Sequence, residues 1–174
     1  LGALAYFETM LEIYDQALTS GLLPDSIVIA SGSGATQAGL LVGAAALGLK
    51  TRIIGVCVSD RKEEFWPVVK RISQQLIETL GLEVDIEKGA IILFDEYLGA
   101  GYGRMTEEIS EVIRNIFQIE GIVLDPVYTS KAMIGLLDLV KRGYFSREEK
   151  VLFIHTGGTP ALFAFRDSLI KLSK

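Results

Sequence analysis

Cysteine and histidine are nearly absent from this 174-residue chain, which contains one of each, Cys57 and His155. A single cysteine cannot form a disulfide within the chain, and no signal peptide stands at its start, so we expect a reducing, cytoplasmic location. A lone histidine without neighbouring ligand residues excludes a zinc site, and we expect no bound metal. Cys57 lies in an apolar run, where a free cysteine usually belongs to the core.

Long hydrophobic runs and basic stretches are missing as well. Hydrophobic residues make up 49% of the chain and the mean hydropathy is +0.37, but no apolar run approaches the ~18 residues that a membrane span requires. The net charge is −5 and the sequence pI is about 5.0, and no basic stripe is available for binding nucleic acid. The high apolar content instead indicates parallel strands that helices cover on both faces.

Helical and strand-like patterns alternate along the chain. Apolar spacing, caps and glycine stops predict helices over residues 4–18, 36–49, 60–80, 106–119, 129–140 and 160–171. Short apolar runs predict strands over residues 26–30, 52–58, 90–94, 122–124 and 151–155. Asp60 is the expected N-cap of the third helix, and Pro67 predicts a kink or a restart inside it. The alternation predicts one α/β domain over residues 1–174, with three α/β/α layers around a doubly wound, mostly parallel, Rossmann-like sheet.

A glycine-rich turn between the first predicted strand and the second predicted helix is the strongest candidate for a binding site. It contains Ser33, Gly34, Ala35 and Thr36. Ligands of such sheets bind where strand ends lead into helix starts, glycines let backbone N–H groups approach an anion, and the hydroxyls add donors. Gln37 takes the place of the third glycine in a dinucleotide motif, and the lysine of a nucleoside triphosphate loop is missing. The turn therefore predicts a cradle for a phosphate monoester, with a tight packing turn as the alternative.

Two further segments carry polar groups near predicted strand ends. After the last strand, Thr156 offers a hydrogen bond and the two glycines that follow permit the approach of a planar ligand. His155 beside them is expected to be structural. Ahead of the fifth predicted helix, Asp125 is a candidate turn cap, and Tyr128 is open to interpretation as core or as a site residue.

The glycine-rich segment 95–103 adds a loop with two tyrosines. Its glycines predict that the loop presents the hydroxyl of Tyr97 or Tyr102. Asp95 and Glu96 resemble an acid–base pair, but adjacent residues on an extended chain point in opposite directions. Both carboxylates are therefore expected to be solvated or to cap a helix.

Taken together, four blocks resemble one family of enzymes through their order and separation: residues 31–39, 101–103, 125–133 and 155–163. The family comprises the pyridoxal-phosphate enzymes D-cysteine desulfhydrase and 1-aminocyclopropane-1-carboxylate deaminase, and is similar to the tryptophan synthase β-subunit (fold type II). The likeness extends over essentially the whole chain, which looks like the C-terminal part of the large, cofactor-phosphate-binding domain. The resemblance implies that Ser33, Gly34, Ala35 and Thr36 hold the phosphate of pyridoxal 5′-phosphate.

The resemblance also implies roles for four side chains and one glycine. Tyr128 matches an active-site tyrosine that approaches the substrate and the cofactor ring, and Tyr102 matches a second tyrosine near the substrate. Thr129 and Thr156 fall where the two subgroups differ, since true deaminases carry an acidic and an aliphatic residue there. Threonine at both positions looks like the desulfhydrase pattern, with one or both hydroxyls facing the pyridine nitrogen, and Gly157 lies against the planar cofactor.

The family's Schiff-base lysine lies well upstream of these blocks and has no counterpart here. Lys131 matches a neighbour within the family motif and is expected to be a surface or packing lysine. The chain opens at Leu1 without methionine, which we interpret as a cut inside a longer polypeptide. The smaller family domain is also missing, so the isolated chain is expected to be inactive without the upstream part. The resemblance further implies a homodimer.

The implied reaction of the parent enzyme is α,β-elimination of a small amino acid, D-cysteine, to pyruvate, ammonia and hydrogen sulfide, a lyase activity. The alternative is the deaminase itself, grouped with hydrolases, which opens the cyclopropane ring to give 2-oxobutanoate and ammonia. A third possibility from another class is a non-catalytic anion-binding domain that retains the phosphate cradle. An FAD or NAD domain is disfavoured by the glycine spacing.

Overall fold

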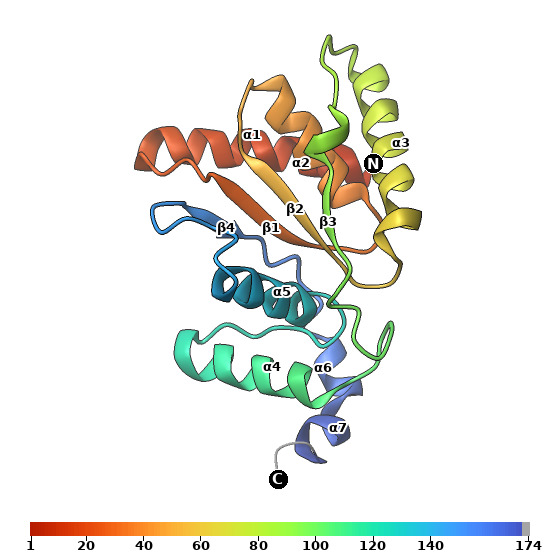
Figure 1. Ribbon diagram of the computed structural model, residues 1–174, viewed down its shortest axis with the longest axis vertical. Helices are drawn as coiled ribbons and strands as arrows, with labels where there is room; N and C mark the ends of the chain where they lie inside the picture. The colour runs from red at the N-terminus through yellow and green to blue at the C-terminus, as the bar shows by residue number, and fades with distance from the viewer. Residues whose placement is uncertain (172–174) are drawn as a thin grey trace.

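In the computed structural model, which describes residues 1–171, the core is a sheet of four parallel strands in the order β3-β2-β1-β4 (Figure 1). The strands are β1 Ser26–Ser31, β2 Arg52–Cys57, β3 Ile92–Phe94 and β4 Val151–Phe153. In register, Val28 of β1 lies opposite Ile54 of β2 on one side and Phe153 of β4 on the other. All six residues of β1 are buried, which explains why its sequence is a continuous apolar run rather than an alternating one.

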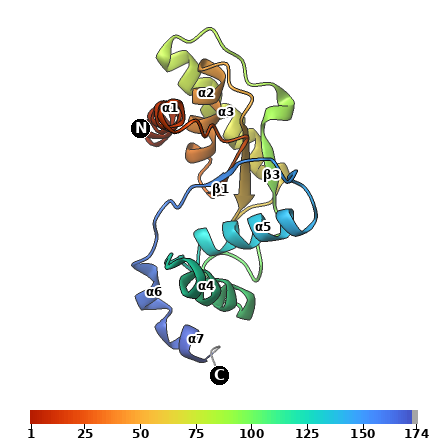
Figure 2. The ribbon, with the colours of Figure 1, turned by 90° about the vertical axis from the view of Figure 1, so that its left-hand side faces the viewer.

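Helices cover both faces of the sheet, as the side view in Figure 2 shows. One face carries α1 Gly2–Ser20, α2 Ala35–Ala46 and α3 Lys62–Leu80, and the other carries α5 Thr129–Lys141, with α4 Glu107–Glu120 packed on its outer side. The remaining elements are short: η1 Lys88–Ala90, α6 Ala161–Ala164 and α7 Arg166–Lys171. Alternate strand residues point to opposite faces, so Ile27 packs under α2 while Val28 packs against α5.

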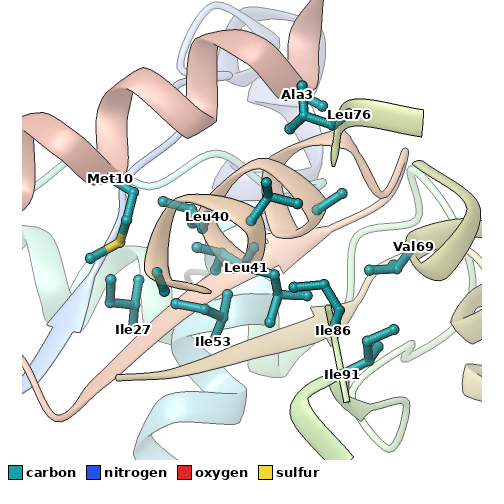
Figure 3. Close-up of a cluster of buried hydrophobic side chains, with 14 of the residues drawn as sticks. Ala3, Met10, Ile27, Leu40, Leu41, Ile53, Val69, Leu76, Ile86 and Ile91 are labelled. Carbon is teal, nitrogen blue, oxygen red and sulfur yellow. The ribbon is translucent and has the colours of Figure 1, made fainter. Parts of the chain in front are cut away.

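The helix pair α1 and α2 packs closely because glycines line the contact. A Cβ atom on Gly39 would lie 2.3 Å from the carbonyl oxygen of Ala3, and one on Gly43 would lie 2.6 Å from the Cβ atom of Met10. Figure 3 shows Met10 above Ile27 and beside Leu40, in the layer between the helices and the sheet. Close approach of α1 therefore seals this side of the core.

Most predicted elements are confirmed, including four of the five strands and the doubly wound α/β architecture. The strand predicted over residues 122–124 is wrong, because this segment joins no sheet and leads directly into the turn at Asp125. Asp60 does not cap α3, which begins after Arg61; the Asp60 carboxylate instead accepts a hydrogen bond from the hydroxyl of Ser59 at 2.5 Å.

Two helices differ from the sequence prediction in their continuity. The restart predicted at Pro67 is wrong, since α3 runs unbroken from Lys62 to Leu80. A proline near the start of a long helix removes one hydrogen bond, which packing of the remaining turns offsets. The last predicted helix is broken at Phe165, whose φ of −102° and ψ of 7° separate α6 from α7.

Across residues 1–171, no helix has both the length and the apolar character to cross a bilayer.

Candidate functional site

The winding of the chain reverses between β1 and β4. The helices α2 and α3 that follow β1 and β2 lie on one face, whereas α5 ahead of β4 lies on the other. In doubly wound sheets, the crevice beyond the strand ends at such a reversal is the usual ligand site. A cavity of about 420 Å³ lies there, and its lining includes six of the residues predicted for the site: Ser33, Thr36, Tyr102, Tyr128, Thr156 and Gly157.

One end of the cavity is the turn from β1 into α2, which the sequence predicts to bind a phosphate. Gly34 stands at the helix N-cap with φ of 80°, a conformation that favours glycine, and it has no side chain to cap the helix. The amide of Ala35 has only a long contact of 3.5 Å with the hydroxyl oxygen of Ser33. The first amides of α2 are thus available to an anion, with the hydroxyls of Ser33 and Thr36 at the cavity wall.

Gln37 fixes this turn to the sheet, a role that the sequence analysis missed. Its side chain is fully buried, and its Nε2 donates to the carbonyl oxygens of Ile53 at 3.3 Å and Ile92 at 2.8 Å. Its Oε1 accepts from the hydroxyl of Ser31 at 2.9 Å. Gly55 leaves room for this amide, since a Cβ there would lie 2.3 Å from Oε1. The sequence offered one signal for this role, a single amide side chain within a predicted helix of mostly small and apolar residues.

The turn into α5 is organised by the buried carboxylate of Asp125, as expected for a turn cap. Its Oδ2 accepts from the amides of Val127 at 2.7 Å and Tyr128 at 2.9 Å. Its Oδ1 accepts from the amide of Thr129 at 2.7 Å and from the Thr129 hydroxyl at 2.8 Å. These four donors fix the backbone that carries Tyr128 into the cavity.

The two threonines predicted to face the pyridine nitrogen have different surroundings. Thr156 lines the cavity. Thr129 is fully buried, and its hydroxyl, besides donating to Asp125, accepts from the Asp125 amide at 2.8 Å. The Thr129 hydroxyl is therefore engaged with its own turn, and a direct contact of Thr129 with the cofactor remains a prediction.

Tyr128 and Tyr102 meet across the cavity. Their hydroxyls are hydrogen-bonded, and their rings are arranged edge to face with centroids 5.9 Å apart. The hydrogen bond with Tyr102 raises the pKa of Tyr128, and burial raises it further. Tyr97, the other tyrosine of this loop, instead packs against Gly135 and donates to Asp138 at 2.6 Å.

The last wall of the cavity is the segment after β4. Gly157 and Gly158 have φ of 95° and 91°, and a Cβ on Gly158 would lie 2.7 Å from the carboxyl carbon of Asp125. His155 is structural, as expected: its Nδ1 accepts from the Gly157 amide at 3.2 Å, so its Nε2 donates to the carbonyl oxygen of Val123 at 2.9 Å. This wall is backbone, which suits close approach of a flat ligand.

The sequence prediction missed the polar side chains of Tyr6 in α1 and Ser59 after β2, which also line the cavity. Tyr6 occupies an apolar helical position, so its pattern indicates packing only. Asp95 has the capping role expected for it, since its carboxylate accepts from the amide of Lys62 at 3.4 Å and lies 3.6 Å from the guanidinium of Arg61.

Comparisons with known proteins agree with this geometry. A family model described as "Pyridoxal-phosphate dependent enzyme" matches residues 1–157. The D-cysteine desulfhydrase of Klebsiella pneumoniae subsp. pneumoniae is 43% identical over 169 residues, which cover 97% of this chain and 50% of that protein. The crystal structure of an ACC deaminase homologue is 39% identical with a TM-score of 0.88, covering 98% of this chain and 50% of that one. O-ureido-L-serine synthase, at 15% identity and a TM-score of 0.56, shares the fold over 98% of this chain and 49% of its own.

Fold and cavity together define a doubly wound α/β protein with a ligand-sized cavity where its winding reverses. The chain belongs to the family of pyridoxal-phosphate dependent enzymes. It spans about half the length of the curated relatives that it matches. Its cofactor is pyridoxal 5′-phosphate, and the residues present fit the phosphate end of that group: an uncapped helix start, two wall hydroxyls and a glycine wall.

Removing the hydroxyls of Ser33 and Thr36 together should weaken cofactor binding. In the full-length protein, we expect Ser33→Ala with Thr36→Val to raise the dissociation constant for pyridoxal phosphate roughly 30-fold or more, since each hydrogen bond to a charged group contributes about 1.5–3 kcal/mol and water replaces part of it. Cofactor absorbance titration of the stripped protein measures this. The matched control is Thr19→Val with Ser20→Ala at the exposed end of α1, whose hydroxyls donate to helix carbonyls and do not line the cavity. Equal affinities of the double variant and the wild type would contradict the assignment.

The tyrosine pair predicts a pH effect. Because its pKa is raised, the protonated phenol of Tyr128 is the form that the fold stabilises. That stabilisation is present below the ordinary pKa of about 10 and is lost as the pH rises through the higher folded value. Tyr102→Phe should move the Tyr128 titration to lower pH, as seen in the phenolate absorbance difference between each protein and its Tyr128→Phe partner. An unmoved or rising titration would contradict the role of the hydrogen bond.

Proposed function

We propose that the full-length protein catalyses α,β-elimination of D-cysteine to pyruvate, ammonia and hydrogen sulfide. The observation that carries this proposal is the composition of one cavity, which joins an uncapped helix start to the Tyr102–Tyr128 pair and to the neutral hydroxyl of Thr156. The relative that is 43% identical is a D-cysteine desulfhydrase, which supports the same substrate.

Each part of the cavity has a task in this reaction. The α2 amides, Ser33 and Thr36 bind and orient the cofactor phosphate. The cofactor, when bound, supplies an electron sink for negative charge at the substrate α-carbon. The phenol oxygens of Tyr128 and Tyr102 orient the substrate and can hold or pass on a proton. The hydroxyl of Thr156 gives the pyridine edge a neutral partner, which suffices for elimination of a good leaving group such as thiolate.

In this proposal, the amine that the chemistry requires comes from a lysine that is not among residues 1–174. In the part of the chain that the structure describes, no lysine lines the cavity. The isolated chain, which spans about half the length of the relatives that it matches, is therefore expected to be inactive. We further propose a homodimer in the cytoplasm, on the family resemblance and the single cysteine.

Ring-opening deamination is the second candidate, favoured by the crystal structure of the ACC deaminase homologue, which is 39% identical. The two candidates differ in class. Elimination of thiolate is a lyase reaction, so the grouping with hydrolases does not fit the proposed activity. The hydroxyl of Thr156, at a position where the resemblance gives true deaminases an aliphatic residue, favours the elimination.

The test is an assay of the full-length protein on both amino acids, with sulfide, pyruvate and 2-oxobutanoate measured. We expect kcat/KM for D-cysteine to exceed that for 1-aminocyclopropane-1-carboxylate by about tenfold or more. This ratio corresponds to a difference of about 1.4 kcal/mol in transition-state stabilisation. Thr156→Leu should lower turnover of D-cysteine while leaving cofactor absorbance in place. Faster turnover of the cyclopropane acid would make the deaminase the better assignment, and a full-length protein without cofactor absorbance would favour a non-catalytic anion-binding domain.

A further inference from the structure

Lys131, in the first turn of α5, is among the largest side chains that the fold buries completely, with 1% exposure. The side chain is therefore removed from water over its whole length. Burying an ammonium costs free energy unless its three protons find acceptors. Lys131 was predicted to be a surface or packing lysine, and the surface alternative is wrong because the side chain is buried.

The acceptors of the Lys131 ammonium are all backbone carbonyls. Its Nζ donates to the carbonyl oxygens of Val58 at 3.1 Å, Leu98 at 2.9 Å and Gly101 at 3.0 Å. Burial lowers the pKa of this group, with no carboxylate among the causes. Neutral carbonyl oxygens around a dehydrated cation are the arrangement in which proteins hold potassium ions.

These carbonyls belong to two segments that are far apart in the sequence, and Lys131 bonds to both. Val58 follows β2, whereas Leu98 and Gly101 belong to the loop between β3 and α4. Gly101 has φ of 113° and directly precedes Tyr102. Since Tyr102 bonds to Tyr128, three positions before Lys131, the start of α5 holds the loop at both its backbone and its tyrosine.

We infer that the Lys131 ammonium is a tethered substitute for a bound monovalent cation, and that it positions the loop that carries Tyr102. The site is a cation site of three carbonyls for which the chain supplies its own cation. The inference rests on the proposed function only for the role of Tyr102, because the cation site itself requires no substrate.

The cation is tested by shortening the side chain in the full-length protein. Lys131→Ala leaves space and three carbonyls, so its unfolding midpoint should fall by roughly 5 °C or more in tetramethylammonium chloride, and potassium chloride at equal ionic strength should restore at least about half of the loss. Lys131→Met fills the space without a charge, so its unfolding midpoint should also fall, and potassium chloride should not restore it. Lys141→Ala removes an exposed charge from the same helix and should respond to neither salt.

Equal midpoints of Lys131→Ala in the two salts would overturn the cation substitute. If the variant does not accumulate as folded protein, its refolding yield in the same two salts is compared, and equal yields overturn it as well. A wild-type midpoint that itself rises specifically with potassium would also overturn it, because the lysine should leave no room for the ion.

Positioning is tested separately by trypsin cleavage after Arg104, an exposed residue of the same loop. Lys131→Met should speed this cleavage about tenfold, since loss of the anchoring hydrogen bonds raises the open population of the loop. Potassium should slow it again in Lys131→Ala only. An unchanged rate in both variants would remove the positioning role. Neither readout involves D-cysteine turnover, so failure of the proposed function would leave these results standing, and the reverse also holds.

Discussion

Replacing Asp125 by alanine should lower the free energy of unfolding by about 4 kcal/mol, because several buried donors would lose their acceptor at once. The Asp125 carboxylate accepts from three amides and from the Thr129 hydroxyl, and its side chain is fully buried. Asp125→Asn should also be destabilising, since one carboxylate oxygen becomes an N–H₂ group that faces donors. Urea unfolding of the full-length protein, followed by circular dichroism, measures both.

The matched control is Asp138→Ala in α5, the helix that follows Asp125. The Asp138 side chain is partly exposed, and its partners Tyr97 and Arg142 keep access to water. Its loss should therefore change stability far less than the loss of Asp125. Amide hydrogen exchange at Val127 and Tyr128 localises the effect, and similar values for the two aspartate variants would contradict the described role of the buried carboxylate.

Gly39→Ala should destabilise the protein by about 2–3 kcal/mol, although alanine is the better helix former. Helix propensity alone would favour alanine by about 0.8–1 kcal/mol, so the sign of the result separates the two effects. The added Cβ would meet the carbonyl oxygen of Ala3 at 2.3 Å and the amide nitrogen of Phe7 at 2.8 Å, and backbone atoms of a helix cannot move singly. The whole of α1 would have to shift.

Thermal and urea unfolding of the full-length protein test this second prediction. Gly89→Ala is the control, because a Cβ at Gly89 would meet open space and its φ is not positive. The shift of α1 should also reach the cavity, since Tyr6 on the same helix lines it. A more stable Gly39→Ala variant would show that α1 and α2 pack less closely than described.

The sequence predicted what local patterns control. The apolar run of β1, the glycine stop of α1 and the cap of α4 each depend on neighbours within a few residues, and the structure confirms all three. The turn over residues 33–36 is local in the same way, because glycine, hydroxyls and a helix start are adjacent in the chain; its role in binding an anion stays a prediction. Residues 122–124 show the limit, because a short apolar run does not indicate whether a neighbouring strand is available to pair with it.

Long-range side-chain contacts were beyond sequence reasoning. In the sequence, Gln37 attracted notice only because it takes the place of a glycine in a dinucleotide motif. Its amide in fact reaches backbone atoms 16 and 55 residues away. Lys131 reaches a carbonyl 73 residues away, so its burial leaves no local pattern. The neighbouring Thr129 was grouped with Thr156 by resemblance, and only the fold distinguishes an engaged hydroxyl from one at the cavity wall.

The amide of Gln37 has a consequence for cooperativity. Because the Gln37 side chain joins the first turn of α2 to the Ser31 hydroxyl of β1 and to backbone carbonyls of β2 and β3, detachment of the edge strand β3 removes one of the contacts that hold this turn. By linkage, a phosphate ester bound at that turn must protect β3 against local opening, although the two lie on opposite ends of the amide's network. Binding at the turn and opening of the sheet edge are thus coupled, so we expect hydrogen exchange in β3 to slow when the ligand is bound.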